Sequence, residues 1–226
     1  MHFEILVEDL SGRRALDFLL PRIVAPKSDT FYIHSYKGIG RIPGNMKDAK
    51  DPSKRILLEN LPKLLKGYGQ AFAGYGAGYR ATVVLICDLD DRDASRFLAD
   101  LQAILDACQP KPQARFCLAI EEGEAWLLGD LKAVRAAYPA ARDEVLSSYK
   151  NDSICGTWEK LADAVYPGGS RSLAKKGWQA IGAEKYKWAE TIAPKMDVET
   201  NASPSFRAFR DALRELGDQA SVPRQE

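Results

Sequence analysis

Four short apolar segments, each bounded by polar or turn-forming residues, lie in the first half of the chain. They cover residues 3–7, 30–35, 82–87 and 114–120, and their length and composition predict β-strands. The stretch 83–87 reads Val-Val-Leu-Ile-Cys without a polar interruption, which is typical of a strand that is buried on both faces of a sheet.

Helical periodicity fills the intervals between these strands. The spacing of apolar residues predicts helices over residues 12–20, 54–66 and 93–108, and a fourth from about 123 toward 138. Ser11 is expected to cap the first helix and Pro21 to end it. Strands that alternate with helices predict an α/β fold, with a mostly parallel four-stranded sheet flanked by helices.

After residue 138 the pattern changes to short helical segments separated by proline and glycine. We therefore divide the chain into an α/β core over residues 1–138 and a helical C-terminal extension over residues 139–226, packed on the core. Ser203 and Pro204 suit the cap and the first position of a final helix.

Composition narrows the class of protein. Of 226 residues, 46% are hydrophobic and 28% charged, and 32 basic against 31 acidic residues give a net charge of +1. This balance argues against binding nucleic acid through the whole surface, but it permits a local basic patch. Neither a secretory signal nor a stretch of about 20 apolar residues stands out, so we expect a cytoplasmic protein that does not cross a membrane.

The cysteines and histidines restrict the metals that the chain could bind. Cys87, Cys108, Cys117 and Cys155 are scattered, with no C-x-x-C motif, and we expect them to be free, buried and reduced. With only two histidines, a histidine-rich zinc site is not expected. A metal would then be held by oxygen atoms, which favours Mg²⁺ or Mn²⁺.

Acidic residues follow three of the four predicted strands: Glu8 after the first, Asp88-Leu89-Asp90 after the third and Glu121-Glu122-Gly123-Glu124 after the fourth. The carboxyl ends of parallel strands lie at one edge of a sheet, where ligands bind. Asp88 and Asp90 are two residues apart in chain that we expect to be still extended, so both side chains point to one side of the sheet and Leu89 points to the other. A divalent cation would relieve the repulsion between such carboxylates, and its free positions would favour phosphoryl chemistry.

An alternative is that acids after strands cap helices. We favour capping or first-turn electrostatics for Asp91 and Asp93. For Glu121 a position in solvent is at least as well supported as a functional one. For Glu8, Asp88, Asp90 and Glu122 we favour function.

These residues resemble a known pattern. Toprim domains, found in topoisomerases, primases and overcoming-lysogenization-defect nucleases, carry a glutamate after the first strand and a D-x-D after a later one. The run Glu122-Gly123-Glu124-Ala125-Trp126-Leu127-Leu128-Gly129-Asp130 resembles the E-x-E-A-W-L-L-x-D signature of the Toprim-like domain-of-unknown-function family 4276. Tyr186-Lys187 and Ser203-Pro204-Ser205-Phe206 resemble later stretches of that family.

The resemblance implies roles for the acids. Glu8 would be the general acid/base or a metal ligand, Asp88 and Asp90 would hold Mg²⁺ or Mn²⁺, and Glu122 with Glu124 would complete the acidic shell. Trp126 itself is predicted to lie in the core rather than to bind a ligand.

Several basic residues could meet phosphate. Between residues 171 and 188 the local net charge is +4 with aromatics interleaved, a composition that can hold phosphates and stack bases, although an ordinary helical surface explains it equally well. The candidates for phosphate or nucleic-acid contact are Arg13, Lys37, Arg41, Lys175, Lys176 and Lys187.

The sequence thus leads to a hypothesis of a Mg²⁺- or Mn²⁺-dependent nuclease, or related phosphotransfer enzyme, acting on DNA or RNA. Toprim relatives of the overcoming-lysogenization-defect kind work with an ATPase in phage defence, so the resemblance also implies a partner ATPase. The alternative is a non-catalytic module that uses the same fold to bind a protein or a nucleic acid. The oligomeric state stays open.

Overall fold

Four parallel strands form the centre of the protein in a computed structural model, which describes residues 1–43, 55–76, 78–154 and 156–221. The strands are β1 (His2–Val7), β2 (Thr30–Ser35), β3 (Ala81–Asp88) and β4 (Ala114–Ala119), in the order β2-β1-β3-β4. All neighbouring pairs are parallel. The predicted α/β fold, with a parallel four-stranded sheet flanked by helices, is confirmed.

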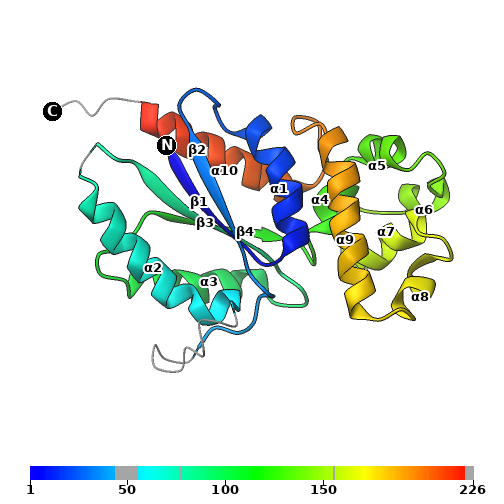
Figure 1. Ribbon diagram of the computed structural model, residues 1–226, viewed down its shortest axis with the longest axis horizontal. Helices are drawn as coiled ribbons and strands as arrows, with labels where there is room; N and C mark the ends of the chain where they lie inside the picture. The colour runs from blue at the N-terminus through cyan, green and yellow to red at the C-terminus, as the bar shows by residue number, and fades with distance from the viewer. Residues whose placement is uncertain (44–54, 77, 155, 222–226) are drawn as a thin grey trace.

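Helices cover both faces of the sheet (Figure 1). The helices α1 (Leu10–Ile23) and α10 (Pro204–Ser221) lie on one face, where Phe3, Ile5 and Val7 of β1 join their core. The helices α2 (Leu57–Gly74) and α3 (Ala94–Asp106) cover the other face, where Leu6 of β1 is buried. The two cores explain why the central strands are so apolar, because strands covered on both faces bury every side chain.

The start and end of α1 differ from the prediction. Asp9 caps the helix by accepting hydrogen bonds from the backbone of Gly12 (2.7 Å) and the hydroxyl of Ser11 (2.6 Å). Ser11 is therefore the donor to the cap rather than the cap itself. Pro21 does not end the helix, which continues to Ile23; proline removes one donor, but hydrogen bonds on either side can hold the last turn.

The fourth predicted helix is two helices in the structure, α4 (Glu124–Leu128) and α5 (Leu131–Ala137). Asp130 separates them, because its carboxylate accepts a hydrogen bond from the backbone of Ala133 (3.0 Å) and so starts a new helix. The chain continues through α6 (Asp143–Ser147), α7 (Thr157–Val165), α8 (Gly169–Ala174), α9 (Trp178–Ile192) and the 3₁₀ turn η3 (Ala193–Lys195).

The C-terminal helices contact the first part of the chain at several places. Helix α9 runs beside α1 (Figure 1), where Arg14 forms an ion pair with Glu190 at 2.9 Å. Helix α10 packs on β4, and its predicted cap is confirmed, since Ser203 Oγ accepts a hydrogen bond from the backbone of Phe206 (3.2 Å). The division of the chain at residue 138 stays a prediction.

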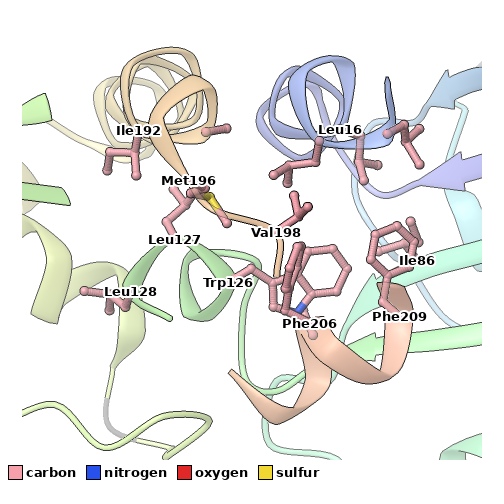
Figure 2. Packing of buried hydrophobic residues seen from close by; sticks show 14 of the residues in the cluster. Leu16, Ile86, Trp126, Leu127, Leu128, Ile192, Met196, Val198, Phe206 and Phe209 are labelled. Atoms are coloured by element: carbon pink, nitrogen blue, oxygen red, sulfur yellow. The ribbon is translucent and has the colours of Figure 1, made fainter. Parts of the chain in front are cut away.

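Trp126 is buried among residues of α10, which confirms its predicted place in the core. Figure 2 shows the indole against Phe206 and Phe209; it stacks on Phe209 with ring centroids 4.9 Å apart. The indole N–H also donates a hydrogen bond to Ser205 Oγ at 3.0 Å. Two segments that are 79 residues apart in the sequence thus form one packing unit beside the sheet.

The remaining sequence expectations concern cysteines and membranes. Cys87, Cys108 and Cys117 are free and buried as predicted, whereas Cys155 lies outside the described residues. Over the ranges that the structure describes, no helix combines the length and apolar character needed to cross a bilayer.

Candidate functional site

Two acids from neighbouring strands meet at the carboxyl edge of the sheet. Val7 and Ile86 are paired in the parallel register of β1 and β3, so Glu8 and Asp88 emerge next to each other. The Glu8 carboxylate accepts a long hydrogen bond from the backbone N–H of Asp88 (3.4 Å). The prediction that parallel strands bring these two acids together is confirmed by this contact.

A third acid, Glu124, reaches the same place from the first residue of α4. Its side chain is only 5% exposed, and Gly123 before it lies against Asp88, since a Cβ on this glycine would be 3.7 Å from Asp88 Oδ1. A cavity of about 50 Å³ is lined by Glu8, Asp88, Gly123 and Glu124. Asp9 also lines it, and its carboxylate caps α1.

Lys185 supplies a positive charge to this cavity from helix α9. Its Nζ atom lies 3.0 Å from Glu124 Oε2, and the side chain is only 15% exposed. The sequence reasoning missed this residue in favour of its neighbours. A signal was present: Lys185 precedes Trp188, Ala189 and Ile192 by three, four and seven positions, so it lies on the buried face of the helix, where a lysine needs an acidic partner.

Glu122 and Glu121 turn toward helix α7. Glu122 accepts a hydrogen bond from the backbone of Trp158 (3.0 Å), and its other oxygen lies 3.4 Å from Lys185 Nζ. Glu121 has a left-handed backbone (φ 62°), and its carboxylate accepts hydrogen bonds from the backbones of Gly156 (2.8 Å) and Thr157 (3.0 Å). The alternative that Glu121 faces solvent is therefore wrong: the carboxylate satisfies amide groups at the start of α7.

Asp90 does not continue the extended strand as predicted. Strand β3 ends at Asp88, and Asp90 has a left-handed φ of 51°. Its side chain is 44% exposed and pairs with Arg92 at 2.5 Å. The prediction of an extended D-x-D is wrong because the chain turns immediately after the strand. Asp93, in contrast, caps α3 by accepting from the backbone of Arg96 (2.8 Å), as predicted.

Burial and mutual repulsion raise the pKa values of the central acids. Burial raises the pKa of Glu8 from its usual 4.5 to about 7, and Asp9 adds to this shift. Burial also raises the pKa of Asp88 well above its usual value, and the charge of Glu8 is the next cause. Two carboxylates in one poorly solvated place favour protonation of at least one of them.

The positive charge of Lys185 compensates the negative charges of Glu122 and Glu124. Burial raises the pKa values of Glu122 and Glu124, while Lys185 opposes both shifts. Burial alone would lower the pKa of Lys185, but Glu124, Glu122 and Asp88 together raise it well above its usual value. Lys185 therefore stays charged at neutral pH.

Three of the predicted phosphate-binding residues lie near the beginning of the chain. Lys37 and Arg41 are exposed in the segment after β2, and the backbone N–H of Gly38 donates to the Glu8 carbonyl (3.0 Å), which brings this segment to the same edge of the sheet. Arg13 is exposed in the first turn of α1. These three residues thus belong to elements that begin or end beside Glu8.

The other three predicted phosphate-binding residues do not line the cavity with the acids. Lys176 binds the hydroxyl of Tyr166 at 2.7 Å, and Lys187 is 58% exposed and lies 3.7 Å from Glu184. Lys176 and Lys187 line a separate hollow on the helical extension. Lys175 is exposed at the end of α8.

The side chains as they stand do not form a complete metal shell. Within the described ranges, no group of three or more His, Cys, Asp or Glu side chains is arranged to hold a metal ion. Magnesium, however, commonly takes only one or two protein carboxylates and completes its shell with water and phosphate. Glu8 and Asp88 could supply such a pair of hard oxygen ligands. Burial keeps their pKa values raised even though the charge of Lys185 lowers both.

Comparison with known proteins gives one match. A sequence model of the protein family described as Domain of unknown function (DUF4276) matches residues 7–214. No curated protein and no solved structure matches the chain. The predicted family resemblance is confirmed, whereas the relationship to Toprim domains stays a prediction.

Proposed function

The chain belongs to the DUF4276 family of unknown function, and on that premise we propose that it is a Mg²⁺- or Mn²⁺-dependent hydrolase of nucleic-acid phosphodiesters. The observation that carries this proposal is the contact between Glu8 and Asp88 at the carboxyl edge of the sheet. Both acids are partly buried and both have raised pKa values, so they would gain from a divalent cation more than solvated carboxylates would.

The two central acids suit different tasks. A bound Mg²⁺ or Mn²⁺ would neutralise a phosphate and make a bound water more acidic, with Asp88 and Glu8 as the residues that hold it. Without a metal Glu8 has a pKa of about 7, so it would release its proton readily when the cation binds. Where a water separates Glu8 from the ion, the same pKa would suit a general acid or base. Asp90, 44% exposed and paired with Arg92, is proposed as an outer group that contributes negative charge.

Basic residues near Glu8 are proposed to hold the nucleic-acid backbone. Lys37, Arg41 and Arg13 are exposed on elements that begin or end at the carboxyl edge. Because the whole chain has a net charge of only +1, binding would depend on this local group and would weaken as salt increases. The Toprim resemblance further implies that a partner ATPase works with this protein, and we include that partner in the proposal.

A non-catalytic binding module is the second candidate function. It is favoured by the capping acids, because Asp9, Glu121 and Asp93 all accept hydrogen bonds from backbone groups at the starts of helices. Such acids have a structural reason to be present without any reaction. Glu8 and Asp88, however, cap no helix, and they distinguish the two candidates.

Thermal unfolding with and without Mn²⁺ tests the metal site. We expect Mn²⁺ at 100 times its Kd to raise the Tm of the wild type by about 5–10 °C and to leave Asp88→Asn unchanged. Asp100→Asn, an exposed acid on α3, is the matched control and should respond like the wild type. An equal rise in the wild type and in Asp88→Asn, or no rise in either, would contradict the proposal.

Incubation with single-stranded DNA, duplex DNA and RNA in the presence of Mn²⁺ tests the reaction. We expect cleavage of at least one substrate by the wild type and by Asp100→Asn, and its loss in Asp88→Asn. Cleavage that persists unchanged in Asp88→Asn would assign the activity to another site or to a contaminant. A metal-dependent rise in Tm without cleavage of any of the three substrates would favour the binding module.

A further inference from the structure

We infer that Lys185 sets the number of divalent ions at this site to one, because its ammonium group occupies the place of a second ion. The inference rests on the proposed function, since it assumes that Glu8 and Asp88 hold a metal. Lys185 belongs to the helical extension. In this inference Glu122 and Glu124 are the ion-pair partners of Lys185 and are not ligands of the metal.

The contacts of Lys185 are those expected of a cation among carboxylates. Its Nζ atom lies 3.0 Å from Glu124 Oε2 and 3.4 Å from Glu122 Oε1. Charge-assisted hydrogen bonds between an ammonium and a carboxylate oxygen are about 2.7–2.9 Å long and are stronger than neutral ones, so the contact with Glu124 is close to this range and the contact with Glu122 is longer. All three side chains are largely buried, so the ammonium is a fixed part of the site.

The acids separate into two groups with different needs. Among the residues that the structure describes, Lys185 forms close ion pairs with Glu122 and Glu124. Its charge also lowers the pKa values of Glu8 and Asp88, but no lysine or arginine of the described residues forms a close ion pair with either of them. Glu124 Oε2 is buried and accepts no well-directed hydrogen bond, so its nearest compensation is the ammonium at 3.0 Å. The Glu8–Asp88 pair is then the remaining place for an added positive charge.

A second divalent ion is disfavoured by position as well as by charge. An ion bound between Glu122 and Glu124 would lie where Lys185 Nζ already is, and like charges at such a distance repel strongly in a buried site. Two-metal phosphoryl-transfer sites place their ions about 3.5–4 Å apart. A fixed ammonium can stabilise negative charge on a phosphate in a comparable position without being lost when metal is scarce.

Counting bound Mn²⁺ on the full chain tests this inference. Equilibrium dialysis with Mn²⁺ should give one ion per chain for the wild type. Lys185→Met should bind two, because Glu122 and Glu124 then face each other without their cation. The control is Lys187→Met on the same helix, 58% exposed and outside the cavity with the acids, which should still bind one.

A second variant keeps the test informative if Lys185→Met does not fold. The triple variant Lys185→Met/Glu122→Gln/Glu124→Gln removes one positive and two negative charges together, so no buried ion is left without its partner. It should bind one Mn²⁺ with a Kd within about threefold of the wild type. A loss of tenfold or more in affinity would show that Glu122 or Glu124 ligates the ion and would overturn the inference.

The outcomes separate this inference from the proposed function. Two ions on the wild type would overturn the inference alone, and so would a folded Lys185→Met that binds one ion. No Mn²⁺ on the wild type would overturn the proposed function and the inference with it. One ion on the wild type and two on Lys185→Met would support both.

Discussion

The Glu8 carboxylate accepts a hydrogen bond from the backbone N–H of Asp88 across 3.4 Å, between two neighbouring parallel strands. The contact places two acids in one poorly solvated position, where burial raises the pKa of each. This is an unfavourable arrangement for the folded protein alone at neutral pH. Acids with strongly shifted pKa values are common at functional sites.

The first prediction is that metal-free wild type loses stability as pH rises from about 4.5 to 7. In the folded state Glu8 keeps its proton up to a pKa of about 7, compared with 4.5 in an ordinary environment. Between these values the folded state binds more protons than the unfolded state, so the free energy of unfolding falls with increasing pH. The Gln side chain of Glu8→Gln cannot ionise. Between pH 4.5 and 7 the free energy of unfolding of this variant should therefore fall by on the order of 2–3 kcal/mol less than that of the wild type.

Urea unfolding in EDTA at pH 5 and pH 8 measures this difference. The control is Glu144→Gln, which changes an exposed acid in the first turn of α6 and should follow the wild type. Equal losses of stability in the wild type and Glu8→Gln would show that Glu8 titrates normally. The Gln variant retains an oxygen that can accept from Asp88, so a change of fold is not required for the effect.

The second prediction concerns Glu121, whose carboxylate holds the start of α7. It accepts hydrogen bonds from the backbones of Gly156 and Thr157, where an anion also favours the positive end of the helix dipole. Glu121→Gln should lower the free energy of unfolding by about 1–2 kcal/mol, because one of the two amide groups would then face an NH₂ group. Urea unfolding at pH 7 measures the loss, and a change no larger than that of Glu144→Gln would contradict the structural role.

The parts of the fold that the sequence could predict are those set by local pattern. All four strands and the spacing of α3 follow from periodicity, because each side chain on a buried face must be apolar whatever surrounds it. The position of Glu8 beside Asp88 follows from the rule that parallel strands end at one edge. These inferences need no knowledge of distant contacts.

The rest depends on contacts between distant segments. The carboxylate of Glu121 is occupied because α7, a distant segment, packs against it. Lys185 reaches the acids because α9 lies beside α1, which the local sequence around either helix does not reveal. The prediction for Asp90 is wrong for a local reason. Its backbone is left-handed (φ 51°), so its side chain does not point in the direction that an extended chain would give it. A D-x-D motif in sequence therefore does not guarantee that both acids point to the same place.

The third prediction is that Trp126 contributes mainly to stability. Its indole packs against Phe206 and Phe209 and donates a hydrogen bond to Ser205. Trp126→Ala should lower the free energy of unfolding by about 3–5 kcal/mol, the usual cost of removing a buried aromatic side chain. Trp178→Ala, which changes a side chain that is 79% exposed, should cost less than about 0.5 kcal/mol. Comparable losses in the two variants would place Trp126 outside the core in solution.

The fourth prediction uses two glycines with opposite surroundings. Gly129 lies where α4 meets the segment before α10, and a Cβ there would be 2.2 Å from Asn201 Oδ1 and 2.8 Å from Ser203 Cβ. Asn201 is itself buried and donates to the Trp126 carbonyl at 2.9 Å, so it cannot move away without breaking that hydrogen bond. Gly129→Ala should therefore destabilise the protein by about 1–3 kcal/mol, as overpacked positions do.

Gly182 gives the matched comparison, because it lies within α9 and a Cβ there would meet nothing within 4 Å. Gly182→Ala should stabilise the protein by about 0.5–1 kcal/mol, since alanine restricts the unfolded chain and favours the helix. Urea unfolding of the two variants at pH 7 should move their midpoints in opposite directions. Midpoints that move in the same direction would mean that the junction around Asn201 yields to the added methyl group. The end of α4 would then be held less tightly against the segment before α10 than the contacts of Asn201 indicate.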